Sequence, residues 1–158
     1  MRKTIIGPIG SPAAPQAEQE WFDLEQLARV EASSEDPTFP IESALVSGKR
    51  PGWRAVKQGA QTIRIIFDKP ASIRRIKLEF SESEIARTQE FTLQWSTAPD
   101  QPLKEIVRQQ WTFSPQGSTV EIEDYQVQLD GVGVLQLDLK PDTTATNAYA
   151  TLARWRIM

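Results

Sequence analysis

The chain has 158 residues, of which 39% are hydrophobic and 25% are charged, and its formal net charge is −3. These values are typical of one globular domain, and no apolar run approaches the roughly 18 residues of a membrane-spanning helix. Cysteine and histidine are both absent, which excludes disulfides, thiolate zinc sites, cysteine nucleophiles and the commonest general base.

The N-terminal residues predict a flexible leader. Gly-Pro, Ser-Pro and Ala-Pro steps without periodicity fill residues 1–17, so we expect one folded domain over residues 18–158. Gly7 and Pro8 interrupt the apolar core that a signal peptide needs. The sequence therefore predicts a cytoplasmic protein, with export by another route as the alternative.

The segment after the leader is predicted to begin with a short amphipathic helix or a helical turn that leads into the first strand, because apolar residues recur at helical spacing between Glu18 and Val30. Charge is distributed unevenly beyond this point. Residues 18–42 contain eight acidic and one basic side chain, whereas residues 49–77 contain nine basic and one acidic. Either these charges complement one another within the fold, or the basic segment forms a face for an anionic partner.

Two half-buried strands are predicted next. Thr62–Asp68 and Arg75–Phe80 both alternate apolar and polar residues at period two. Pro70 lies between them and lacks the donor that a strand interior needs, so Asp68–Ala71 is predicted to be a turn that makes the strands antiparallel neighbours. The alternation breaks before Ile76, which indicates a bulge near Arg74.

Short strands are predicted to continue to the end of the chain, with turn residues between them at regular spacing. The strand phase is expected to shift across Glu123-Asp124, and Asp130-Gly131 is expected to be a turn. Seven or eight such strands favour a β-sandwich. The predicted core comprises Ile65, Phe67, Ile76, Leu78, Leu93, Trp95, Leu137 and Trp155.

The stretch from Ala32 to Phe80 also carries a family pattern. A-S-S-E-D-P leads through Ala44-Leu45 and a loop to Trp53, and then to a strand, a D-K-P turn and the strand I-R-R-I-K-L. This order resembles the discoidin family, also called the coagulation factor 5/8 type C domain, and weaker similarity extends it over roughly residues 28–158. The resemblance implies an all-β, eight-stranded jelly-roll sandwich of the galactose-binding-like type.

The resemblance also implies a ligand site on loops at one end of the sandwich. The corresponding loops are residues 46–57, 81–89, 114–118 and 140–149, with Trp53 packed beneath the first of them. Loop side chains with suitable donors and acceptors are the candidates for ligand contact. The candidate ligand-binding residues are Lys49, Arg50, Arg54, Glu84, Arg87, Asp142, Asn147 and Tyr149.

No metal and no cofactor are expected. Many discoidin-like domains hold calcium beneath the first of these loops, but here the corresponding segment reads A-L-V-S-G-K and the last strand reads A-R-W-R. Calcium requires several oxygen ligands, and these segments place cations where carboxylates would be needed.

No catalytic constellation is predicted either. Glu82 with Glu84, and Glu121 with Glu123, are spaced i and i+2, which on a strand places both carboxylates on the solvent face. We therefore expect a non-catalytic carbohydrate-binding module. The alternative is an intracellular protein-interaction module that acts as a scaffold, and nucleic-acid binding is a third interpretation. The partner is thus predicted to be a glycan or a protein, with no prediction for the oligomeric state.

Overall fold

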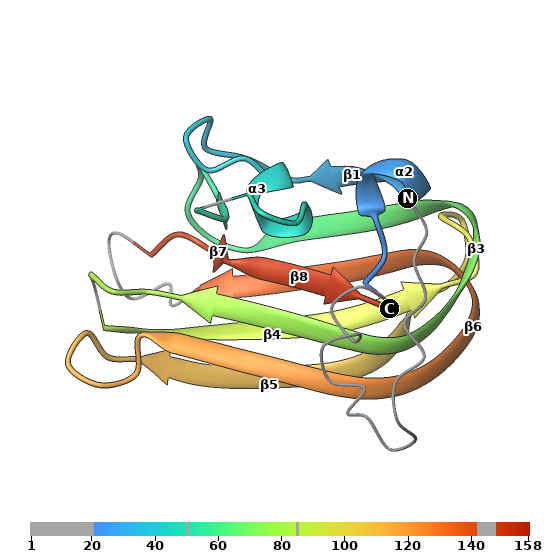
Figure 1. Ribbon diagram of the computed structural model, residues 1–158. Helices are drawn as coiled ribbons and strands as arrows, with labels where there is room; N and C mark the ends of the chain where they lie inside the picture. The colour runs from blue at the N-terminus through green and yellow to red at the C-terminus, as the bar shows by residue number, and fades with distance from the viewer. Residues whose placement is uncertain (1–20, 50, 85, 142–147) are drawn as a thin grey trace, which may run out of the picture.

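A computed structural model describes residues 21–49, 51–84, 86–141 and 148–158. The described chain consists of strands with two one-turn helices (Figure 1). The elements are α2 (Leu24–Leu27), β1 (Ala28–Ala32), α3 (Glu42–Leu45), β2 (Trp53–Arg54), β3 (Gln61–Ser81), β4 (Arg87–Ser96), β5 (Lys104–Phe113), β6 (Val120–Pro141), β7 (Thr151–Leu152) and β8 (Arg154–Ile157).

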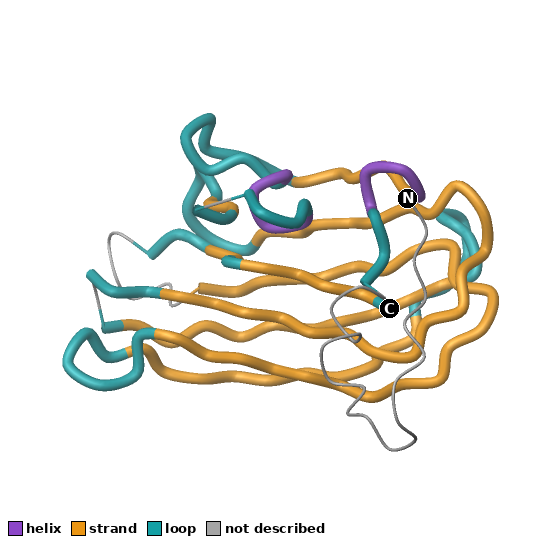
Figure 2. The backbone as a smooth tube through the Cα atoms, in the orientation of Figure 1, coloured by secondary structure: helices purple, strands orange, loops and turns teal. Residues whose placement is uncertain are grey.

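Two long strands, β3 and β6, run through both layers of a sandwich (Figures 1 and 2). In one layer the strand order is β1-β3-β6-β4-β5, and in the other β3 lies between β8 and β6. The two strands remain antiparallel partners throughout, from Gln61 opposite Leu139 to Ser81 opposite Val120. The all-β jelly-roll sandwich expected from the resemblance is confirmed.

The predicted hairpin at Asp68–Ala71 is wrong. The chain bends there and continues in the other layer, and β6 bends beside it at Gly131, whose φ of 68° suits glycine. Pro70 and Gly131 thus mark a corner that both strands turn together, rather than two separate turns. The bulge predicted near Arg74 is confirmed by a register shift between Ile73 and Arg75.

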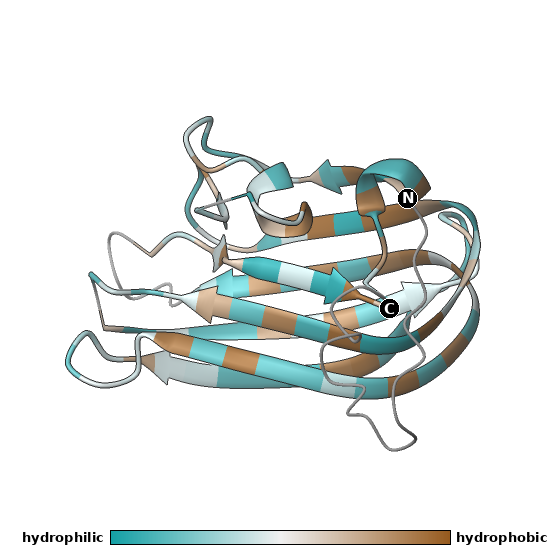
Figure 3. Ribbon diagram, viewed as in Figure 1, coloured by the Kyte–Doolittle hydropathy of each residue, from teal (hydrophilic) through white to brown (hydrophobic). Residues whose placement is uncertain are grey.

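The hydrophobic core lies between the layers, and the strands around it alternate hydrophobic and hydrophilic residues along their length (Figure 3). Seven of the eight predicted core residues are buried. Trp95 is the exception, because it lies near the end of β4 and is only half-buried. The ammonium of Lys104 covers its ring at 5.2 Å from the centroid, an arrangement typical of a partly exposed cation–π pair.

Of the two forms predicted for the N-terminal segment, the structure has the helical turn, α2, which leads directly into β1. α2 ends at Leu27 because the next residue, Ala28, already pairs with Phe67 of β3. Strand pairing thus overrides local helical spacing. Phe22 holds the segment in place through an edge contact with the Phe67 ring and a 2.7 Å hydrogen bond from its N–H to the carbonyl oxygen of Ile157.

Part of the charge asymmetry is compensated inside the fold. Arg64 lies 3.6 Å from a Glu31 oxygen, and Arg74 lies 3.0 Å from Asp130. Arg75 pairs with Asp124. The first of the two interpretations of the basic segment is therefore confirmed for these three arginines. None of the described helices is long and apolar enough to span a membrane.

Candidate ligand-binding site at the loop end

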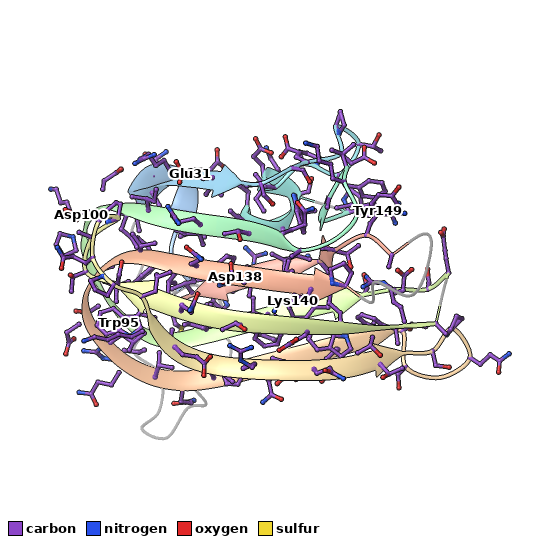
Figure 4. All side chains as sticks on the ribbon, turned by 180° about the vertical axis from the view of Figure 1, so that it is seen from behind. Glu31, Trp95, Asp100, Asp138, Lys140 and Tyr149 are labelled. Carbon is purple, nitrogen blue, oxygen red and sulfur yellow. The ribbon has the colours of Figure 1, made fainter. Side chains whose placement is uncertain are left out.

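The loops predicted to bind a ligand meet at one end of the sandwich, on the left in Figure 1, as far as they are described. β2 and β7 join two of them, because Trp53 pairs with Leu152 and Arg54 with Thr151. From behind, Figure 4 shows Tyr149 at this end and Trp95 toward the opposite one. The sequence therefore predicted correctly which loops share an end.

The two serines of the A-S-S segment hold the first loop in place. Ser33 Oγ and Ser34 Oγ both donate to Oε1 of the buried Gln61, at 2.6 and 2.7 Å. Ser34 Oγ also accepts a hydrogen bond from the N–H of Val56, and the Gln61 amide donates to the carbonyl oxygen of Lys57. These side chains have a structural role, because their polar groups are used within the loop.

Trp53 lies beneath this loop, as the resemblance implied. Its side chain is 1% exposed, and its Nε1 donates to the carbonyl oxygen of Ser34 at 3.0 Å. Gly52 precedes it with φ 111°, and a Cβ at this position would lie 2.8 Å from the carbonyl oxygen of Leu152. Glycine is therefore required for β2 and β7 to approach each other.

Arg87 is not a surface ligand for any partner, which corrects one candidate. It begins β4 instead of lying in a loop, and its side chain is fully buried. Its Nε donates to Glu82 at 2.7 Å, and its terminal nitrogens donate to Gln89 at 2.7 Å and to Thr151 at 2.9 Å. The guanidinium therefore joins β4 to the loop after β3 and to β7, and it positions the loop end.

The other candidates differ in how accessible their side chains are to a ligand. Lys49 and Glu84 are exposed, and Tyr149 is half-buried. Arg54 is half-buried too, with its guanidinium 4.5 Å from the centre of the Phe39 ring. The remaining candidates, Arg50, Asp142 and Asn147, lie outside the described residues.

One hollow at this end is small. It measures about 60 Å³ and is lined by residues that include Phe39, Trp53, Arg54 and Thr151. Small-molecule sites usually measure about 300 to 1,000 Å³. This hollow by itself is therefore too small for a whole small-molecule ligand. Among the described residues no cluster of three or more acidic side chains forms a metal site, and the expected absence of calcium stays a prediction.

Residues 120–123 of β6 face the opposite way from the prediction. Val120 and Ile122 face solvent, at 48% and 52% exposure, whereas Glu121 and Glu123 are half-buried in phase with Tyr125. The expected phase shift at Glu123-Asp124 and the expected solvent position of the two carboxylates are both wrong. The alternation of Tyr125, Val127 and Leu129, extended backward at period two, would have placed them correctly.

The two carboxylates interact with each other. A hydrogen bond with Glu123, followed by burial and by the charge of Glu123, raises the pKa of Glu121. The Tyr125 hydroxyl donates to Glu123 Oε2 at 3.0 Å, and burial together with the charge of Glu123 raises the pKa of Tyr125. Such a group can share a proton, but it lies on the part of β6 that pairs with β3 alone. Two carboxylates side by side on one strand do not flank a substrate as a glycosidase pair does.

Solved structures with the same fold are carbohydrate-binding modules. A pectin-binding module is 18% identical over 84% of this chain and 90% of its own, with a TM-score of 0.61. The family 32 module of Clostridium perfringens NanJ, in complex with galactose, is 11% identical over 87% and 96%, with a TM-score of 0.59. Two family 32 domains of C. perfringens ZmpB give 14% identity over 94% and 39%, with a TM-score of 0.67. At these identities the similarity shows the fold alone.

Sequence comparison is more specific. No curated protein matches the chain. One family model does match, the XRCC1 N terminal domain, from residue 24 to residue 136. This match spans most of the chain, from α2 through β1 to β5 and into the second half of β6. The galactose-binding-like jelly roll inferred from the A-S-S-E-D-P segment is the fold of this family, and the chain belongs to the XRCC1 N-terminal domain family.

Proposed function

We propose that this chain is a non-catalytic module that binds another protein. The observation that carries the proposal is the internal use of polar groups at the loop end. The guanidinium of Arg87 donates hydrogen bonds to Glu82, Gln89 and Thr151. The guanidinium of Arg54 lies over the Phe39 ring. A sugar site needs several convergent free donors and acceptors in a concave surface, whereas a protein partner can bind a shallow one.

The fold match does not by itself favour a sugar as the ligand. The match to the XRCC1 N terminal domain rests on sequence and covers most of the chain, whereas the similarity to carbohydrate-binding modules rests on fold at 11 to 18% identity. Fold similarity alone does not carry function between proteins. The choice of ligand class therefore depends on the side chains of this chain.

Carbohydrate binding is the second candidate. The neighbours include a module in complex with galactose, and Lys49, Glu84 and Tyr149 lie on loops at the same end of this sandwich with at least partial exposure. Their side chains offer charged donors, an acceptor and an aromatic ring. A single shallow site of this kind would bind with a Kd of about 0.1 to 1 mM.

Two parallel experiments separate the candidates. The immobilised full chain is used to capture proteins from an extract of the cells that produce it, and the same preparation is applied to a glycan array. We expect one protein to be retained in stoichiometric amount and no glycan to bind. A glycan that binds wild type but not a Tyr149→Ala variant, with no protein retained, would reverse the order of the candidates.

A further inference from the structure

A groove with an apolar floor and an acidic rim lies between α2, α3 and β1. Two neighbouring hollows of about 230 and 290 Å³ form it, and both are lined by Leu24, Glu25, Leu45 and Val46. The groove is distinct from the hollow at the loop end, because the two share no lining residue. Each volume suits one or a few side chains rather than a whole metabolite.

The floor of the groove is apolar because the edge of the sandwich is incompletely covered there. Leu24, Ile41 and Leu45 belong to the buried core, while Ala28 and Val30 on the inward face of β1 are only partly buried. β1 has a strand partner on one side only, namely β3. Apolar side chains of a partner would therefore continue the packing of the core at this edge.

The rim of the groove is negative. Glu25 and Glu42 line the 230 Å³ hollow and Asp23 lines the other, and none of the three forms an ion pair with the described residues. Arg156 is the one cation that lines either hollow among these residues. The surplus of acidic side chains contrasts with the basic segment, in which Arg64, Arg74 and Arg75 form ion pairs within the fold.

Three other carboxylates nearby differ from these three, because they have partners within the fold. Glu35 accepts a hydrogen bond from the N–H of Ile41, Asp36 accepts one from the N–H of Thr38, and Glu31 lies near Arg29 and Arg64. The carboxylates of Asp23, Glu25 and Glu42 have no such hydrogen bond or ion pair with the described residues. Their negative charge is thus available to a cationic partner, and it disfavours nucleic acids and anionic membranes.

We propose that this groove binds a segment of a partner protein in which apolar side chains are flanked by lysine or arginine. The inference rests on the proposed protein-binding function and names the chemistry of the partner. Leucine-sized side chains would enter the two hollows, and the flanking cations would lie against Glu25, Glu42 and Asp23. Apolar contacts anchor such a complex, and the charges on the rim select the partner and speed association.

The test uses the full chain and two labelled synthetic peptides. One peptide contains leucines and lysines, and the other has glutamate in place of each lysine. Fluorescence anisotropy should show saturable binding of the lysine peptide alone. Binding should weaken between about 0.05 and 0.5 M salt without vanishing, because only its electrostatic part is screened. Equal binding of both peptides, or binding of neither, overturns the proposal.

Variants locate the site. A Glu25→Lys/Glu42→Lys chain should bind the lysine peptide at least about tenfold more weakly, and Val46→Ser, which alters the floor without changing charge, should weaken it several-fold. Asp100→Lys/Glu105→Lys is the matched control, because it makes the same change in net charge at exposed positions that line neither hollow. Equal loss in the control and the rim variant overturns the proposal, provided that all variants melt as wild type does.

Two further outcomes are informative. If the wild-type chain self-associates and the rim substitutions dissociate it, the groove binds a second copy and the assignment to another protein is overturned. If a protein is captured from the extract equally well by wild type and by the rim variant, the groove assignment fails while the proposed function stands. If no protein is captured at all, the proposed function fails.

Discussion

The Nε of Arg87 donates a 2.7 Å hydrogen bond to Glu82 in a pair that is almost entirely removed from solvent. The same guanidinium reaches Thr151 on β7. One side chain thus ties the loop before β4 to β7, which lies 64 residues further along the chain. The shape of the loop end depends on this buried ion pair.

Replacing Arg87 by alanine should destabilise the protein by about 3 to 5 kcal/mol, because it leaves the largely buried Glu82 carboxylate without its charged partner. Urea denaturation measures the change. Arg108→Ala is the control, since Arg108 is exposed and its pairs with Glu90 and Glu105 should contribute at most about 1 kcal/mol. Similar losses in both variants would show that the Arg87 pair is not buried in solution.

Trp95→Ala should cost less than Phe91→Ala. Trp95 is half-buried beneath Lys104, so its removal should destabilise the fold by about 1 to 2 kcal/mol, whereas the fully buried Phe91 should give about 3 to 5 kcal/mol. Thermal or urea unfolding compares the two variants directly. A larger loss for Trp95 would place its ring in the core.

Gly133→Ala should destabilise the protein by about 1 to 3 kcal/mol. A Cβ at residue 133 would overlap the carbonyl group of Thr97, which is backbone and has little freedom to move. Gly117→Ala is the control, because a Cβ there meets nothing within 4 Å and the backbone conformation is ordinary. A neutral Gly133→Ala variant would mean that the loop after β4 does not cross this point of β6.

Glu121→Gln should stabilise the protein near pH 7 by about 0.5 kcal/mol, the scale of a like-charge pair on a sheet. The pKa of Glu121 is raised in the folded state by its interaction with Glu123 and by burial. Its stabilising contribution is therefore present below its unfolded pKa and is lost as the pH rises through the folded pKa. The advantage of the neutral variant should disappear near pH 4, and urea midpoints across this range measure it. An advantage that grows toward low pH would contradict the assigned direction.

The strand faces could be predicted from sequence because period-two alternation is a local property. Leu93 and Leu137 are buried as expected. The corner at Pro70 could not be predicted in the same way, since a hairpin and a bend use the same turn residues. What decides between them is β6, whose residues 120–132 accompany the second half of β3 across the corner.

The family resemblance predicted that the four loops share one end, but not the surroundings of their side chains. Lys49 and Glu84 are exposed at this end, and their contact with a ligand stays a prediction. Arg87 looks like any loop arginine in the sequence, because its burial depends on Glu82, Gln89 and a threonine 64 residues away. The acidic groove was visible only as an excess of negative charge in residues 18–42. Its apolar floor comes from α3 and β1, which only the fold brings together.

The claim that this chain binds a protein is tested most directly by measuring the molar mass of the species in which the chain occurs in cells. Tagged full chain is recovered under native conditions from the cells that produce it and is measured by size-exclusion chromatography with light scattering. A chain that binds a protein should be recovered as a complex with a second polypeptide in a fixed ratio. Recovery of the chain without any other polypeptide, together with a glycan that it binds, would contradict the account.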